Sequence, residues 1–257
     1  MSWQTDLLGL LAASAVSLLT APTGVSGAVF LLPLHLSVFH VPNPSVTPTN
    51  LLYNVVSGPG ALLRYSRRAS LRSRLVGRLV RGTLPGVLLG SVVRVYVIAD
   101  PDAFRLCAAA VLLPLGAWLG LSSGRAAGTA PLSDRTITTL AVVVGFIGGV
   151  YGIGGGSLLG PLLVGTGMSV ALVAPATLVS TFVTSIAGAA SYVALAQVAG
   201  ADVAPDWSLG IACGIGGLIG GYLGASAQPY LPERALRRLL GSLAVAVAVV
   251  YAVQALG

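Results

Sequence analysis

Long apolar stretches separated by short polar loops run along almost the whole chain. Six of them are about 20 residues long, the length that an α-helix needs to cross the ~30 Å hydrocarbon core of a bilayer. Four others are shorter and form two adjacent pairs, which predicts two helical hairpins beside six crossings. The predicted crossings are residues 47–64, 79–98, 103–121, 172–198, 207–226 and 235–256, and the hairpin arms are residues 5–20 and 24–39, then 134–150 and 156–167.

A glycine cluster separates the two arms of the second hairpin. Six of the ten residues from Gly148 to Ser157 are glycine, and each glycine costs a helix interior about 1 kcal/mol relative to alanine. A broken helix is tolerated in a bilayer only where its backbone is buried in protein or lines a polar cavity, because an unpaired N–H or C=O facing lipid costs several kcal/mol. The cluster therefore predicts a helix break that forms part of a binding site.

The two hairpins belong to an internal repeat. Equivalent positions, at nearly constant spacing, are Gly24 and Gly152, Pro33 and Pro161, and Pro48 and Pro175. Later in each half a glycine recurs every four residues, at positions 82, 86 and 90 and again at positions 216, 220 and 224. Rows of small residues at this period let helix backbones approach closely in lipid, so we interpret them as packing faces. Paired broken helices in related halves are typical of a transporter's substrate site.

The composition places this repeat in a membrane. The 257 residues are 55% hydrophobic and 8% charged, with a mean hydropathy of +0.91, whereas a soluble protein carries roughly a quarter charged residues. We therefore predict an all-α polytopic membrane protein that forms one transmembrane domain over residues 1–257, with repeat one at 5–121 and repeat two at 134–256. The first apolar stretch has no basic leader and matches an internal one, so we interpret it as mature structure and not as a signal peptide.

All fourteen basic residues are arginine, and the net charge is +7. They lie in short loops between apolar spans, which argues against nucleic-acid binding and instead reports topology. The segment from Arg64 to Arg81 holds seven of them and is therefore predicted to be cytoplasmic. The same segment offers a contact for anionic lipids, although a topology signal alone explains it.

The arginines favour hairpins that return to the side from which they enter. In that case all the arginines except Arg94 and Arg105 lie on the cytoplasmic side, and both chain ends are external. Three crossings per half then make the two repeats inverted relative to each other. The alternative is eight full spans, four per half, with each hairpin counted as one crossing. That alternative places the loop of Arg234, Arg237 and Arg238 outside and a purely acidic loop inside.

The breaks are the candidate site for an anion. Their exposed N–H groups and the positive ends of the helices that start there attract negative charge. The candidate backbone positions are Gly24, Gly27, Gly154, Gly155 and Gly156. Nearby side chains that can donate hydrogen bonds are Thr23, Ser26, Thr49, Asn50, Asn54, Ser157, Thr177, Ser180 and Thr181. For Thr177 and Thr181 the alternative is a hydroxyl bonded to its own i−4 carbonyl, as is common in membrane helices.

Few other residues suggest chemistry. His35 lies deep in the first hairpin, where it is either a proton carrier or a hydrogen-bonded structural histidine. Arg94 lies near the external end of its predicted span, and we expect its side chain to extend toward water. The glycine cluster lacks the GK[ST] ending of a nucleotide loop, and Cys107 and Cys213 have no metal-site spacing. We therefore predict no catalytic residue, no metal and no cofactor.

Both glycine breaks with their following proline resemble those of the TauE/SafE sulfite exporter family of membrane permeases. The matching residues are Gly24-Val25-Ser26-Gly27 with Pro33, and Gly152-Ile153-Gly154-Gly155-Gly156 with Pro161. The resemblance covers nearly the whole chain. It implies a secondary transporter of small sulfur-containing or organic anions, such as sulfite or sulfonates, in a prokaryotic plasma membrane. A passive anion channel and an accessory membrane subunit are the alternatives, whereas no nucleophile–base pair or paired carboxylate favours an enzyme.

Overall fold

Helices are the regular elements of this protein. The structure is a computed structural model that describes residues 3–68, 70–97, 132–199 and 203–256, with a few further residues between 106 and 117. The helices are α1 (Trp3–Thr20), η1 (Ala21–Thr23), α2 (Ala28–Ser37), α3 (Asn43–Ser66), α4 (Arg74–Tyr96), α6 (Asp134–Tyr151), α7 (Gly156–Gly165), α8 (Val170–Ala199), α9 (Trp207–Ala227), η3 (Gln228–Tyr230) and α10 (Glu233–Leu256).

The prediction of an all-helical, multi-pass membrane protein is confirmed. Five helical segments among the described residues are long and apolar enough to cross a membrane: Trp3–Thr23, Arg74–Tyr96, Asp134–Tyr151, Val170–Ala199 and Trp207–Tyr230. The first and third of these contain the leading hairpin arms, which lie close to their predicted bounds and are long enough to cross, although their sequences placed them among the shorter apolar stretches. The second arms, α2 and α7, have 10 residues each and reach only about 15 Å. The predicted span 103–121 and the acidic loop before it lie largely outside the described residues.

The helix ends follow from local chemistry. Ser73, Ser133 and Asp206 stand just before α4, α6 and α9, and each side chain accepts a hydrogen bond from a backbone N–H of the first turn. At the far ends of the two leading arms, Gly24 and Gly152 adopt left-handed φ angles of 80° and 69°. Such angles are strained for other residues, so glycine stops both helices at equivalent places.

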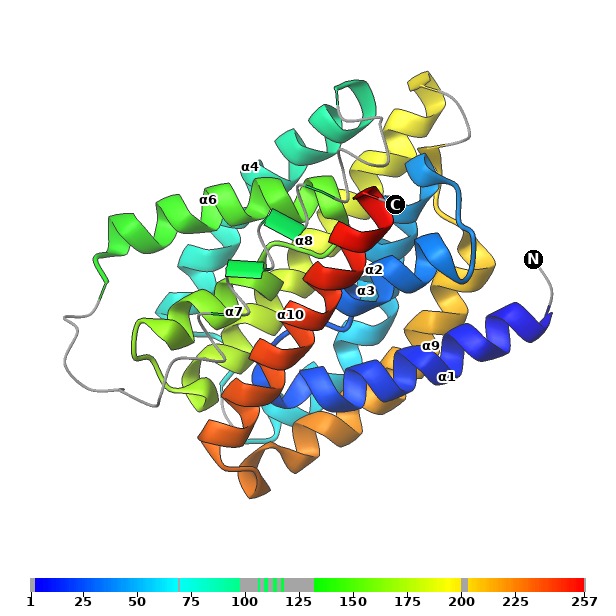
Figure 1. Cartoon of the computed structure of the whole chain (residues 1–257). Coiled ribbons are helices and arrows are strands. Elements are labelled where there is room, and N and C mark those ends of the chain that lie inside the picture. Colours follow the sequence, from blue (N-terminus) through cyan, green and yellow to red (C-terminus); the bar gives the residue numbers. More distant parts are fainter. Residues whose placement is uncertain are drawn as a thin grey trace.

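The two glycine rows bring together helices from different halves. A methyl group added at Gly216, Gly220 or Gly224 of α9 would overlap the carbonyl oxygen of Leu10, Ser14 or Leu18 of α1, respectively. On α4, Gly82, Gly86 and Gly90 face the carbonyl oxygens of Thr138, Val142 and Phe146 of α6 in the same order. The paired helices are therefore parallel and in backbone contact, as small-residue packing in lipid allows. Figure 1 shows α1 beside α9 and α4 beside α6 on opposite flanks of the bundle.

The helices α3 and α8 pack together in the middle of the bundle and run in opposite directions. Gly58 of α3 contacts Phe182 of α8, whereas Leu51, one turn and more earlier in α3, contacts Gly188, later in α8. The first of these helices runs parallel to α9, and the second runs parallel to α4. These six helices thus fall into two sets of opposite direction, with α1, α3 and α9 in one set and α4, α6 and α8 in the other.

Polar contacts at one end of the bundle agree with these directions. Arg78 at the start of α4 forms an ion pair with Asp134 at the start of α6. Arg68, just after α3, donates to the carbonyl oxygens of Ala225 and Ser226 at the end of α9. The arginine-rich end of the bundle therefore gathers the starts of one set of helices and the ends of the other.

The glycine rows make a packing prediction. We expect Gly220→Ala to lower stability by about 1–3 kcal/mol, because its methyl group would overlap the Ser14 carbonyl. Gly77→Ala on α4 is the control, since nothing lies within 4 Å of the added methyl group there, and we expect it to leave stability unchanged or raise it by up to about 1 kcal/mol. Thermal unfolding in detergent measures both variants, and equal melting temperatures would contradict the close contact.

Candidate functional site

A buried polar stripe on each central helix faces the breaks. On α3 the stripe is Asn50, Tyr53, Asn54 and Ser57, and on α8 it is Thr177, Ser180, Thr181 and Thr184. Both have the i, i+3, i+4, i+7 spacing that places residues on one helix face, and they occupy equivalent repeat positions. Five of these residues are candidates from the sequence, whereas Tyr53, Ser57 and Thr184 were missed, although the helical period alone would have found them.

Side chains of α3 satisfy the backbone of the first break. Asn50 donates from Nδ2 to the carbonyl oxygen of Ala28 at 2.8 Å. Ser26, inside the break, donates to Asn54 Oδ1 and accepts the N–H of Ala28 at 3.2 Å. Tyr53 shares a hydrogen bond of 2.5 Å with Ser17 of α1. The break is thus a polar junction between α1, α2 and α3.

Hydroxyl groups of α8 play the same part at the second break. The N–H of Gly155 donates to Thr184 Oγ1 at 3.1 Å, so one of the N–H groups predicted to bind an anion already has a partner. Ser157 donates to the carbonyl oxygen of Ile153 at 2.6 Å and lies 3.4 Å from Thr181 Oγ1. Thr181 is the repeat equivalent of Asn54, but its partner Ser157 lies three positions after Gly154, the equivalent of Ser26.

One hydroxyl joins the two halves directly. Thr177 Oγ1 lies 2.9 Å from the carbonyl oxygen of Gly24 and 3.0 Å from its own i−4 carbonyl at Val173. The two interpretations considered for Thr177 therefore both apply, since the hydroxyl faces its own helix and the opposite break. For Thr181 the structure gives the contact with Ser157 and not an i−4 bond.

Three polar residues lie elsewhere than expected from the sequence. Thr49 bonds the Ser45 carbonyl at 2.6 Å and accepts the N–H of Asp206 at 2.8 Å, so it faces the start of α9 and not a break. His35 is fully buried with Nε2 3.7 Å from Cys213 Sγ, away from the cavity described below. The expectation that Arg94 extends toward water is wrong.

Arg94 is 2% exposed and turns into the protein. Its guanidinium donates to the carbonyl oxygen of Asn43 at 3.0 Å and to Asn43 Oδ1 at 2.6 Å, while Nε lies 3.4 Å from Thr47 Oγ1. The start of α3 offers these acceptors beside the end of α4. Buried acceptors hold the charge in place of water, which explains why the side chain does not extend to the surface.

A cavity of about 30 Å³ adjoins the first break. None of its lining residues is charged, and those with polar side chains are Ser17, Thr20, Ser26, Tyr53, Asn54, Ser57 and Thr181. Two of its polar groups, Asn54 Nδ2 and Thr20 Oγ1, are buried and have no hydrogen-bond partner within the described part of the chain. An unpartnered buried amide donor costs stability, so it marks a place where a further acceptor is needed.

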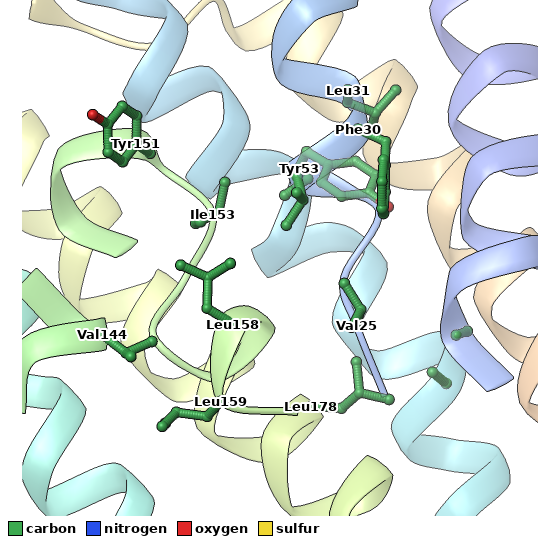
Figure 2. Close-up of a cluster of buried hydrophobic side chains, with 14 of the residues drawn as sticks. Val25, Phe30, Leu31, Tyr53, Val144, Tyr151, Ile153, Leu158, Leu159 and Leu178 are labelled. Carbon is green, nitrogen blue, oxygen red and sulfur yellow. The ribbon is translucent and has the colours of Figure 1, made fainter. Parts of the chain in front are cut away.

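An apolar cluster forms the remaining wall of this cavity. Val25 of the first break and Leu178 of α8 line the cavity and belong to the same cluster as Ile153, Leu158 and Leu159 of the second hairpin. Figure 2 shows Val25 on the loop of the first break and Ile153 on the loop of the second, with Leu158 and Leu159 on the segment that follows the second. Val25 and Ile153 are equivalent repeat positions, so each break contributes one branched apolar side chain to the cluster.

Comparison with known proteins adds a family. The family model described as sulfite exporter TauE/SafE matches residues 9–251, which include both breaks and both polar stripes. No curated protein and no solved structure matches the chain. Among the described residues, no group of three or more His, Cys, Asp or Glu side chains could hold a metal ion.

The contact between the halves gives a second prediction. We expect Thr177→Val to destabilise the protein by about 1–3 kcal/mol, because the buried carbonyl of Gly24 loses this hydrogen bond. Thr138→Val is the matched control, since its hydroxyl bonds the i−4 carbonyl of Asp134 near the surface, and we expect a change within about 0.5 kcal/mol. Chemical or thermal unfolding measures the difference, and equal stabilities would show that Thr177 contributes only a local bond.

Proposed function

The chain belongs to the sulfite exporter TauE/SafE family, and from that premise we propose that it is a secondary transporter of sulfite or small sulfonates in a prokaryotic plasma membrane, with its anion site in the cavity at the first break. The family consists of membrane transporters for sulfur-containing anions and is not a class of enzymes.

The unpartnered amide of Asn54 carries the proposal. Asn54 and Thr20 both line the cavity, and Asn54 Nδ2 and Thr20 Oγ1 are buried without a hydrogen-bond partner in the described residues. An oxyanion is the acceptor that such donors lack, and the absence of charge from the cavity lining removes repulsion between the site and an anion. Gly24, Gly27 and Ser26 bring the backbone of the break to the same place. Gly154, Gly155, Gly156, Ser157 and Thr181 would serve as the counterpart surface when the path opens through the second half.

The helix directions support inverted repeats with hairpins that return to their own side. If α1 and α2 together made one broken crossing, α3 would run opposite to α1, yet both run parallel to α9. The ion pair between Arg78 and Asp134 also supports one shared side for the arginine-rich loop and the start of α6. On this basis the repeats extend over 5–121 and 134–256, with three crossings each, and the leading arms α1 and α6 enter deeply before the breaks. The arginines from 64 to 81 then face the cytoplasm and contact anionic lipids.

Transport in proteoliposomes tests the function. We expect saturable uptake and counterflow of sulfite or thiosulfate, with sulfoacetate and acetate as probes of size and charge. Counterflow arises only when one site faces the two sides in turn. Non-saturating flux without counterflow would instead identify a passive anion channel, and absence of flux for all four anions would favour the accessory subunit.

The cavity makes a specific prediction about binding. Asn54→Leu removes the free donor at nearly constant volume, and we expect it to weaken anion binding by about 1–3 kcal/mol, or roughly 5- to 150-fold in Kd. The control is Ser191→Ala, which removes a hydroxyl on α8 that bonds Ser91 outside the cavity. The readout is the rise in melting temperature on adding sulfite, which follows binding even without transport. If sulfite raises the melting temperature of the Asn54 variant as much as that of the unaltered protein, the amide is not part of the anion site.

The topology can be tested separately. We expect a reporter fused to the C-terminus to be external, on the side opposite the loop of Arg64–Arg81. An oxidation-sensitive reporter such as alkaline phosphatase would be active there, and the same reporter inserted after Arg72 would be inactive. A cytoplasmic C-terminus would overturn three crossings per half and, with them, the inverted repeat.

A further inference from the structure

Each glycine row ends in a long polar side chain. The i+4 series on α4 is Gly82, Gly86, Gly90 and then Arg94, and the series from α9 into η3 is Gly216, Gly220, Gly224 and then Gln228. The glycines of the second series face the carbonyls of Leu10, Ser14 and Leu18, and the next residue at that period is Pro22. The glycines of the first series face the carbonyls of Thr138, Val142 and Phe146, and the next residue is Val150.

Gln228 continues the row by a hydrogen bond. Its Nε2 group donates to the carbonyl oxygen of Pro22 at 2.9 Å. Pro22 lies in η1, two residues before the left-handed Gly24, and its neighbour Ala21 lines the cavity and accepts a hydrogen bond from Tyr65 at 3.0 Å. This bond therefore ties the wall of the cavity to the arginine-rich end of the bundle.

Arg94 reaches the equivalent carbonyl through one intermediate. Its Nε group lies 3.4 Å from Thr47 Oγ1, and the hydroxyl of Thr47 donates to the carbonyl oxygen of Val150 at 3.2 Å. Val150 lies two residues before the left-handed Gly152, as Pro22 does before Gly24. The two arrangements are thus repeat equivalents at opposite ends of the bundle.

We propose that Gln228 and Arg94 are positioning residues that act as equivalent clasps, each holding one break against the neighbouring glycine row, and that each clasp is released when the anion path opens toward its own end. This inference rests on the proposed transport function. Both clasps are formed in this structure, in which the cavity is only about 30 Å³. The clasp of Gln228, at the arginine-rich end, is the inner clasp and bonds its carbonyl directly at 2.9 Å. The clasp of Arg94, at the opposite end, is the outer clasp and reaches its carbonyl through the neutral hydroxyl of Thr47 at 3.2 Å.

Thiol labelling tests the clasps without requiring transport. The probes are Val25→Cys and Ile153→Cys, equivalent positions that are 3% and 5% exposed, in a chain whose native cysteines are replaced by alanine. A membrane-impermeant maleimide is applied from each side of sealed vesicles. Gln228→Leu should raise the labelling rate of the cysteine at position 25 about tenfold from the arginine-rich side and leave position 153 unchanged. Thr47→Val, which interrupts the outer clasp, should raise labelling at position 153 from the opposite side only.

Matched variants make the result decisive. Gln197→Leu makes the same change at an exposed glutamine of α8 and should leave both rates unchanged. If Gln228→Leu does not fold, Gln228→Asn shortens the side chain, retains its polarity and should give the same directional increase. An unchanged labelling rate in a folded Gln228 variant would contradict the proposed clasps. An equal increase in the rate at both probes from both sides would contradict them as well. Altered labelling in a chain that moves none of the tested anions would keep the clasps and refute the proposed function.

Discussion

No water is available in the hydrocarbon core to pair with backbone groups that a broken helix exposes. The two breaks are therefore tolerated only because neighbouring helices supply partners for them. Asn50 donates to the carbonyl of Ala28 at the first break, and Thr184 accepts the N–H of Gly155 at the second. The glycine rows add close backbone contact between α1 and α9 and between α4 and α6, the helices that lead into the two breaks.

Several of these partners come from the opposite half. Thr177 of the second half bonds Gly24 of the first, and Thr47 of the first half bonds Val150 of the second. The leading arm of each half packs on the glycine row of the other. Each break is therefore completed by residues that lie more than 100 positions away in the sequence, and a movement of one half against the other acts directly on both breaks.

Helix positions, both breaks and the glycine rows could be predicted from the sequence, because apolar run length, glycine and proline act locally. The hydrogen-bond partners of individual polar side chains could not be predicted from the sequence. Arg94 was expected at the surface, but acceptors on Asn43, some fifty residues away, hold it inside. Thr49 differs from Asn50 by one position, yet that step turns its hydroxyl to Asp206. The unpartnered polar groups of Asn54 and Thr20 could not be predicted either, because they are the groups that remain after all other hydrogen bonds are made.

The polar stripes of α3 and α8 occupy equivalent places but differ in chemistry. Asn50, Tyr53 and Asn54 stand where the second half has Thr177, Ser180 and Thr181. Two identical inverted halves would give an inward-open and an outward-open form of equal energy, because rotation by half a turn would convert one into the other. In the proposed transporter, the exchange of amides for hydroxyls would remove that degeneracy, and each 1.4 kcal/mol of difference would change the ratio of the two forms tenfold. Divergence between the repeats would thus give the resting protein a preferred orientation before any gradient acts on it.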